Sequence, residues 1–233
     1  MKLNCFKLMY IQGFTTFSFL DCFFDHYVTV SSFVHDFIKS TYDIETAIIP
    51  AFIQVDRYEP ASPWDDRPAH SITINLKGDG EQQRLLLARL RKVLDHRAPE
   101  IAAAIDWEGA VLQAHGELPA RELLRLIGAA RYFLTLSAAE GFGLIPLEAM
   151  ALGATVVGFD GFGGRHYMRP GVNCAVCPYP DRADLADLII AVMRDPAYAA
   201  ALAQAGRRTA AEYSHERFRA AWIAEFERAL AKP

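Results

Sequence analysis

Over residues 71–231 of this 233-residue chain, segments whose apolar residues recur with a helical period alternate with segments that have the pattern of a strand. In residues 81–96 the leucines recur along one broad helical face, whereas residues 154–159 form the continuous apolar run of a strand buried in a parallel sheet. We expect strands at 71–75, 110–114, 132–136 and 154–159, and helices at 81–96, 119–130, 144–152, 181–193, 196–213 and 214–231. This succession predicts an α/β fold with a doubly wound parallel sheet.

The first 56 residues have the same character but are too few to form a core of their own. Strands are expected at 7–12, 27–30 and 46–49, and a helix capped by Ser31 or Ser32 continues to Ser40. We expect residues 1–56 to be the remnant of a larger amino-terminal domain. The other boundaries follow from composition: residues 57–69, with three prolines, form a linker, residues 70–213 the main domain and residues 214–233 a carboxyl-terminal helix.

Composition excludes several classes of function. Hydrophobic residues make up 52% of the chain and the net charge is -4, so we expect a packed core and no bulk attraction to nucleic acid or anionic membranes. No apolar run approaches the roughly 18 residues of a membrane-spanning helix. Lys2 and Lys7 lie near an apolar stretch, which faintly suggests a signal peptide, but polar residues interrupt the stretch and no small-residue cleavage site follows. We therefore expect a cytoplasmic protein without a transmembrane segment.

The cysteines predict neither a metal site nor a redox centre. Cys174 and Cys177 form a lone C-x-x-C pair, and no second pair stands at zinc-finger spacing. The pair precedes Pro178 in an extended or turn-like segment, whereas a redox pair opens a helix. We interpret these cysteines as small apolar residues in a reducing compartment.

The candidate chemistry lies in residues 138–151, where Glu140 and Glu148 stand on either side of a Gly-Phe-Gly turn. Glu148 falls within the apolar run 144–152, and a carboxylate on such a helix is costly to bury without hydrogen bonds. The glycines permit close approach of a ligand, and the N–H groups at the helix start suit an anion. The pattern predicts a phosphate-bearing, hydroxyl-rich ligand. The alternative is a loop whose glutamates merely point to solvent.

A second glycine-rich loop strengthens the ligand hypothesis. Residues 160–164 read Asp-Gly-Phe-Gly-Gly and follow the apolar run 154–159. Both loops are therefore expected at the carboxyl ends of strands, where open α/β sheets bind their ligands.

The sequence around both loops resembles the retaining family-4 glycosyltransferases (glycosyl transferases group 1), which have the GT-B fold. Glu140 to Glu148 is similar to the E-x7-E motif of that family. Other similar segments cover most of the chain: Ser137 to Leu144, Leu147 to Ala151, Thr155 to Gly164, Pro170 to Asn173 and, less closely, residues 29–60. The resemblance implies that residues 70–213 are the Rossmann-like, nucleotide-sugar-binding half of a GT-B fold. Residues 1–56 would be the end of the acceptor-side half.

The resemblance also implies roles for individual residues. Glu140 would be the catalytic residue, facing the hydroxyl groups of the donor sugar, and Glu148 would bind the ribose. The remaining donor-binding positions would be Gly141, Phe142, Gly143, Leu144, Lys77, Gly163, Gly164 and Arg165. Enzymes with the GT-B fold require no metal, so we expect no cofactor besides the nucleotide-diphosphate sugar that serves as donor.

The chain departs from the family pattern in its cations and in its length. The family usually places an Arg and a Lys after the first strand of the second domain, and here only Lys77 remains, unless Arg165 or Arg169 contributes. Residues 165–167 replace a Glu that often follows the Gly-Gly pair, which could alter the choice of sugar. Most of the acceptor-side domain has no counterpart here, so no acceptor-binding residue is assigned.

We therefore expect a retaining GT-B glycosyltransferase that moves a sugar from a nucleotide-diphosphate sugar to an unidentified glycan, lipid or small-molecule acceptor. The main alternative is a non-catalytic nucleotide-sugar-binding module, or a truncated pseudoenzyme completed by a partner that supplies the missing amino-terminal domain. A nucleotide-sugar epimerase of the same fold is less favoured, because such enzymes lack the Glu-Gly-Phe-Gly context. His26 and His35 adjoin apolar residues and are interpreted as packed or solvated side chains.

Overall fold

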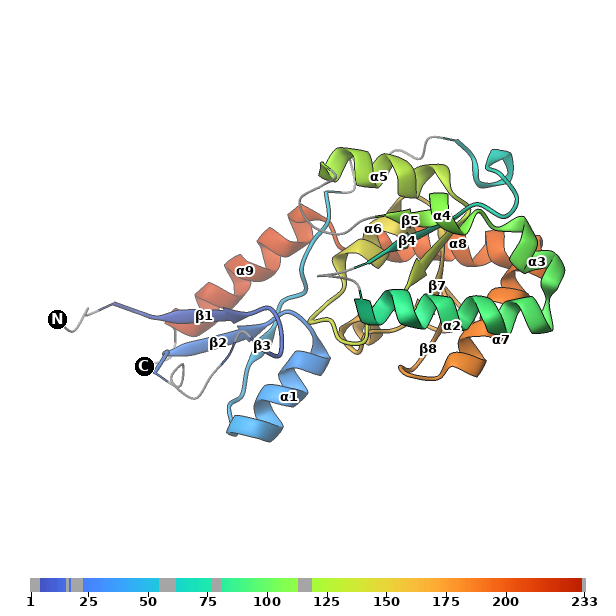
Figure 1. The fold of residues 1–233 in the computed structure, drawn as a ribbon. Coiled ribbons are helices and arrows are strands. Elements are labelled where there is room, and N and C mark those ends of the chain that lie inside the picture. Colours follow the sequence, from blue (N-terminus) through green and yellow to red (C-terminus); the bar gives the residue numbers. More distant parts are fainter. Residues whose placement is uncertain are drawn as a thin grey trace.

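The computed structural model describes residues 5–15, 17, 23–54, 62–76, 81–112 and 119–231. They form two lobes of α/β type, each built around a parallel sheet (Figure 1). The α/β class and the parallel sheets expected from the sequence are thereby confirmed. The side chains of residues 112, 182 and 183 lie outside the description.

The amino-terminal lobe is a small βαβ structure. Its sheet has the order β1-β2-β3, with β1 at Leu8–Ile11, β2 at His26–Thr29 and β3 at Ala47–Ile48. Helix α1 (Ser32–Tyr42) joins β2 to β3, and the side chain of Ser31 accepts a hydrogen bond from the Val34 N–H at its start. The expected strands and the cap at Ser31 are confirmed.

The larger lobe contains a five-stranded parallel sheet of order β5-β4-β6-β7-β8. Its strands are β4 (Ile72–Asn75), β5 (Val111–Leu112), β6 (Tyr132–Thr135), β7 (Thr155–Phe159) and β8 (Ala175–Cys177). Strand β4 pairs with β5 on one side and with β6 on the other. The strand order therefore reverses between β4 and β6, and ligands of open α/β sheets bind at the carboxyl ends of such a pair.

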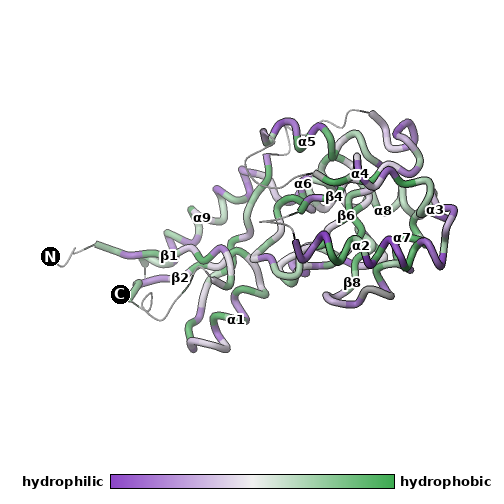
Figure 2. The backbone as a smooth tube through the Cα atoms, viewed as in Figure 1, coloured by the Kyte–Doolittle hydropathy of each residue, from purple (hydrophilic) through white to green (hydrophobic). Residues whose placement is uncertain are grey.

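Helices cover this sheet, most of them in the crossovers between its strands and the last two after β8 (Figure 1). They are α2 (Glu81–Arg97), α3 (Pro99–Ala104), α4 (Trp107–Ala110), α5 (Ala120–Ala129), α6 (Leu144–Ala151), α7 (Arg182–Arg194) and α8 (Pro196–Ala210). In Figure 2 the strands of the sheet are largely hydrophobic, whereas the turns of α2 and α3 carry many hydrophilic residues. The short elements α3, α4 and β8 have no counterpart among the expected elements.

The last helix returns to the amino-terminal lobe. Helix α9 (His215–Leu230) leaves the larger lobe and lies along β1 and β2 (Figure 1). Its Trp222 ring meets the Tyr10 ring edge-on at 5.3 Å between centroids, and Glu225 pairs with His26 Nε2 at 2.5 Å. Ser214 accepts a hydrogen bond from the Arg217 N–H and is the expected N-cap.

The two lobes share one hydrophobic core. Ile11, Val30 and Val34 of the amino-terminal lobe belong to the same buried cluster as Phe133 and Leu147 of the larger lobe. A second cluster fills the space between the sheet and helices α2, α3 and α7. Because this buried cluster contains side chains of both lobes, the amino-terminal lobe packs directly against the larger lobe.

The segment before β4 contributes buried contacts of its own. Trp64 lies in a 3₁₀ turn (Trp64–Asp66), and its indole N–H donates to the Arg131 carbonyl and the Thr155 hydroxyl. Residues 57–61 of the expected linker, and residues 55 and 56 before it, lie outside the described residues. The domain boundaries at 56, 69 and 213 remain predictions. Among the described residues no helix is long and apolar enough to cross a membrane.

Candidate functional site

Two loops at the carboxyl ends of neighbouring strands form the candidate site. The first glycine loop (residues 136–143) follows β6 and leads into α6, and the second glycine loop (residues 160–164) follows β7. Strand β6 is one of the two strands at which the strand order reverses. The sheet therefore brings the two predicted loops to the edge where a ligand is expected.

The two loops touch through their backbones. The N–H of Glu140 donates to the Gly161 carbonyl at 2.7 Å, and the N–H of Gly163 donates to the Glu140 carbonyl at 3.1 Å. A Cβ atom on Gly163 would stand 2.4 Å from the Glu140 carbonyl oxygen, so only glycine permits this approach.

Three carbonyl groups of the first glycine loop, those of Glu140, Gly141 and Gly143, accept hydrogen bonds from protein donors. Gly163 N–H binds the Glu140 carbonyl, Ser31 Oγ donates to the Gly141 carbonyl at 2.6 Å, and Tyr167 Oη donates to the Gly143 carbonyl at 2.5 Å. The peptide bonds of this loop are trans, so each C=O points away from the N–H of the next residue. The N–H groups of Gly141, Phe142 and Leu144 are thereby turned away from these donors.

None of these three N–H groups has a hydrogen-bond partner within the described part of the chain. They stand at the start of α6, whose N-cap Gly143 has a left-handed φ of 87° and offers no side-chain cap. The unpaired N–H groups and the positive end of the helix dipole favour an anion at this point.

A cavity of about 470 Å³ opens beside these N–H groups, between the two lobes. Its lining is drawn from the first glycine loop, from the ends of the first sheet and from α9: Tyr10, Gln12, Val30, Ala51, Phe52, Glu140, Gly141, Phe142, Gly143, Leu144, Ile145 and Phe218. The cavity thus contains five of the predicted donor-site residues. A ligand at the first glycine loop would also meet the amino-terminal lobe.

The predicted glutamates and apolar residues differ in exposure. Glu140 and Glu148 are half-buried, and each makes a contact within the molecule. Leu144, which stands one turn before Glu148 on α6, is 43% exposed. Phe142 is 4% exposed and packs against the rings of Tyr167 and Tyr213, so only its backbone can face a ligand.

The cations named as candidates for the diphosphate differ in the partners they contact. Arg165 Nε pairs with Asp160 Oδ2 at 2.7 Å, and its guanidinium lies 4.8 Å from the centroid of the Phe162 ring. Arg169 donates to the carbonyls of Arg165 and Met168, both at 3.1 Å, and so serves the local backbone. Lys77 lies outside the described residues.

Several residues that complete the site were not predicted from the sequence. Tyr167 reaches the first glycine loop from beyond the second one, and Gln12 faces Gly141 from the amino-terminal lobe. Ser31 was expected only as a helix cap, yet its hydroxyl also binds the Gly141 carbonyl. The sequence signals the cap through a Ser before a helical run, but it does not signal the contact 110 residues away.

Burial keeps the cysteines of the C-x-x-C pair protonated. The pKa of Cys174 is raised to about 12 and that of Cys177 to about 11, in both cases mainly because the thiols are withdrawn from water. Both are free thiols, and the described residues contain no cluster of three or more potential metal ligands.

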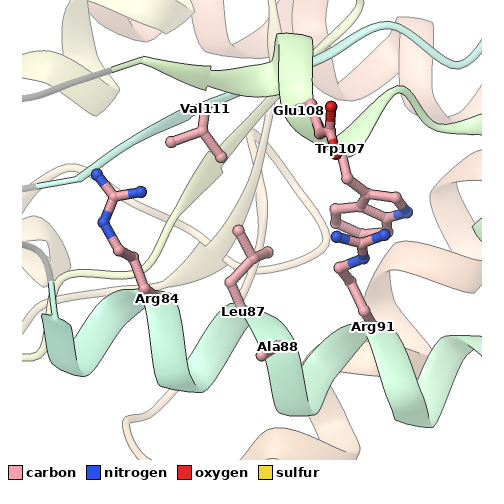
Figure 3. Close-up of a pocket in the computed structure, with 7 residues that line it drawn as sticks. All are labelled: Arg84, Leu87, Ala88, Arg91, Trp107, Glu108 and Val111. Carbon is pink, nitrogen blue, oxygen red and sulfur yellow. The ribbon is translucent and has the colours of Figure 1, made fainter.

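A second cavity of about 380 Å³ lies between α2 and the segment from Trp107 to Val111 (Figure 3). Arg84, Leu87, Ala88 and Arg91 of α2 form one wall, and Trp107, Glu108 and Val111 form the other. The guanidinium of Arg91 stacks on the Trp107 ring at 5.4 Å. No residue of either glycine loop reaches this cavity.

Comparisons with known proteins agree with this geometry. The family model described as "Glycosyl transferases group 1" matches residues 109–209, which include both glycine loops. No curated protein gave a significant match.

Solved structures share the fold over nearly the whole chain. Sucrose-phosphate synthase from Thermosynechococcus elongatus matches with a TM-score of 0.70 and 18% identity, covering 90% of this chain and 59% of its own. A glycosyltransferase from Rickettsia africae matches with a TM-score of 0.69 and 16% identity, covering 89% and 64%. HepE of Anabaena, solved in complex with UDP, matches with a TM-score of 0.71 and 16% identity, covering 94% and 71%.

The chain thus spans less than two thirds of the first two of these structures. Residues 109–209 match the glycosyl transferases group 1 family, and the chain that carries them has the fold of the GT-B glycosyltransferases.

Proposed function

We propose that this chain is the nucleotide-sugar-binding part of a retaining glycosyltransferase, which transfers a sugar from a nucleotide-diphosphate sugar to an acceptor. One observation carries the proposal. The N–H groups of Gly141, Phe142 and Leu144 have no partner among the described residues, and they stand together at the start of α6, beside a cavity that Glu140 also lines. They suit a diphosphate, and the carboxylate suits the hydroxyl groups of a sugar.

The spacing along α6 supports a ribose contact at Glu148. Leu144 and Glu148 are four residues apart in the same helix and therefore lie on one face. A ligand whose diphosphate meets the helix start would reach Glu148 one turn further on, about 5.4 Å along the axis. A carboxylate accepts two hydrogen bonds from the neighbouring hydroxyls of a ribose. HepE of Anabaena was solved in complex with UDP-glucose, which is a donor of this class.

The proposed chemistry depends on fixed charges rather than on a metal. Departure of the nucleotide diphosphate builds negative charge, which pre-oriented N–H groups and the α6 dipole would stabilise. Lys77 and Arg165 would add positive charge. Arg165 pairs with Asp160 through Nε, and among the described residues neither of its terminal NH₂ groups has a hydrogen bond. Glu140 would hold the donor sugar in position for transfer. The free thiols support a reducing, cytoplasmic location.

Calorimetric titration with UDP- and GDP-sugars tests the donor site. We expect one nucleotide class to bind the unmodified chain and Glu148→Ala to lose at least about tenfold in affinity, because two charge-assisted hydrogen bonds disappear. Glu227→Ala, at an exposed position on α9, is the matched control and should bind as the unmodified chain does. Absence of binding by every nucleotide sugar would overturn the donor site. Equal affinity in Glu148→Ala would overturn the ribose contact alone.

A non-catalytic nucleotide-sugar-binding module is the second candidate. It needs only the donor contacts at the first glycine loop, and these are the contacts on which the first candidate also rests. Donor hydrolysis and transfer to mixed glycan, lipid and small-molecule acceptors distinguish the candidates. Turnover that is lost in Glu140→Gln supports the transferase, whereas binding without turnover supports the module.

A further inference from the structure

The first turn of α1 is fastened to both glycine loops by three consecutive residues. Ser31 Oγ donates to the Gly141 carbonyl at 2.6 Å, and the backbone N–H of Ser32 donates to His166 Nδ1 at 3.3 Å. The Phe33 ring stacks on Phe162, with 5.0 Å between centroids and 18° between planes. Each partner lies more than 100 residues away in the sequence, so this contact joins the amino-terminal lobe to the candidate site.

The contact with Ser32 fixes the protonation state of His166. A ring nitrogen that accepts an N–H bond carries no proton, so the imidazole is neutral and its proton is on Nε2. If Nδ1 were protonated, it could turn only to Ser32 Oγ at 3.4 Å, and the helix N–H would lose its acceptor. The contact as observed therefore requires neutral His166.

The surroundings of His166 oppose a positive charge. Arg165 and Arg169 are its charged neighbours on the same segment, and Tyr213 faces it from the segment before α9, with 6.3 Å between ring centroids. From α1 it meets Ser32, which does not titrate, and the positive end of the helix dipole. Burial, together with the nearby Arg169, lowers the pKa of His166 below its ordinary value of 6.5.

We propose that His166 is a positioning residue for the donor, and that its neutral imidazole holds the first turn of α1 against the two glycine loops. Ser31 and Ser32 are adjacent, so release of the Ser32 N–H also loosens the bond from Ser31 to the Gly141 carbonyl. That bond sets the direction of the Phe142 N–H, which belongs to the diphosphate site of the proposed function. Protonation of His166 would therefore separate the lobe from the loops and weaken donor binding.

The direction of the pH effect follows from the lowered pKa. A histidine that is less readily protonated in the folded state than in the unfolded state stabilises the fold in its neutral form. The contact is therefore complete above pH 6.5 and is lost as the pH falls through the lower pKa of the folded state.

Two substitutions separate the hydrogen bond from the titration. His166→Asn places an amide oxygen near the position of Nδ1, which accepts the Ser32 N–H and does not titrate. His166→Leu removes the acceptor at every pH. The readouts are the exchange protection of the Ser32 amide and the dissociation constant for the nucleotide sugar that the unmodified chain binds, each measured between pH 5 and pH 8.

In the unmodified chain we expect both readouts to weaken as the pH falls through the lowered pKa of His166, by up to about five- to tenfold, the loss that corresponds to one buried hydrogen bond. His166→Asn should hold both nearly constant, and His166→Leu should show the weakened values throughout. His35→Asn is the matched control, because His35 lies on the same helix but its Nδ1 pairs with Thr46 at 2.8 Å. Its pH profile should follow that of the unmodified chain.

Identical pH profiles for the unmodified chain and His166→Asn would overturn the proposal, as would unchanged Ser32 protection in His166→Leu. An unchanged dissociation constant for the nucleotide sugar in a variant that has lost the Ser32 contact would overturn the positioning role. The expected change in donor affinity rests on the proposed function, but the amide exchange of Ser32 is measured without a ligand. A chain that binds no nucleotide sugar would refute the donor site and the positioning role together, while Ser32 protection still decides whether the contact exists.

Discussion

At the scale of single residues, Tyr167 orients a peptide group at the start of α6. Its hydroxyl is the donor to the Gly143 carbonyl, and its side chain is only 2% exposed. Burial and the neighbouring Glu140 raise the pKa of Tyr167 well above the ordinary value, so the hydroxyl keeps its proton as a donor. Gly143 is the N-cap of α6, and its peptide plane sets the direction of the Leu144 N–H.

Tyr167→Phe should therefore lower both stability and donor affinity. The substitution leaves a buried carbonyl without its donor, and we expect a loss of about 1–3 kcal/mol in the free energy of unfolding, measured in urea. The dissociation constant for the nucleotide sugar should rise as well, because Gly143 can rotate.

Tyr213→Phe is the control for this change. The Tyr213 ring packs against Phe142, but its hydroxyl has no hydrogen bond among the described residues. A loss in Tyr167→Phe no larger than in Tyr213→Phe would contradict the role of the Tyr167 hydroxyl.

The residue scale also shows how far the sequence predicts the site. Glu140, Gly141 and Gly163 belong to local patterns, and the structure brings them together at the loops. Tyr167 and Gln12 belong to no local pattern, because their importance comes from backbone atoms they meet only after folding. Local chemistry was predictable, but the contacts that orient the peptide planes were not.

At the scale of elements, Arg67 joins the ends of two helices. Its guanidinium donates to the carbonyls of Ala130 and Leu152, each at 2.8 Å, which are the C-caps of α5 and α6. It also donates to the Ser62 carbonyl and is 3% exposed. Burial, with a smaller effect of Arg207, lowers the pKa of Arg67 to about 10, so the group is still charged at neutral pH. One side chain thereby satisfies orphan carbonyls at the ends of both helices.

Arg67→Met should destabilise the larger lobe by about 3 kcal/mol or more, because several buried carbonyls lose their donors at once. Arg67→Lys keeps the charge but lacks the planar guanidinium, so its free energy of unfolding should lie between those of the unmodified chain and Arg67→Met. Thermal and urea unfolding measure the effect. Arg89→Met, at an exposed position on α2, should change stability by less than about 0.5 kcal/mol. Similar losses at both positions would show that Arg67 does not cap the helices.

Periodicity predicted the long elements and missed the short ones for a physical reason. Helix α2 has 17 residues with buried leucines along one face, and β7 is apolar throughout. Helix α4 has four residues and β8 has three, which is less than is needed to display a period. Arg67 shows the same limit, because its segment resembled a linker while its side chain is buried.

At the scale of the whole molecule, the amino-terminal lobe meets the site through backbone contacts. A Cβ atom on Gly141 would stand 1.9 Å from the carbonyl oxygen of Gln12, which lies just after β1. Neither atom belongs to a side chain that can rotate away. The closeness of the two lobes therefore depends on this one position being glycine.

Gly141→Ala should force the lobes apart, whereas Gly13→Ala should not. A Cβ atom on Gly13 meets nothing within 4 Å, so alanine there should be neutral or stabilise the chain by up to about 1 kcal/mol through the unfolded state. For Gly141→Ala we expect a loss of about 1–3 kcal/mol in the free energy of unfolding and faster amide exchange in both β1 and the first glycine loop, because the clash is shared by the two lobes. Faster exchange confined to the first glycine loop would show that the loop yields alone, and that the lobes do not depend on this contact.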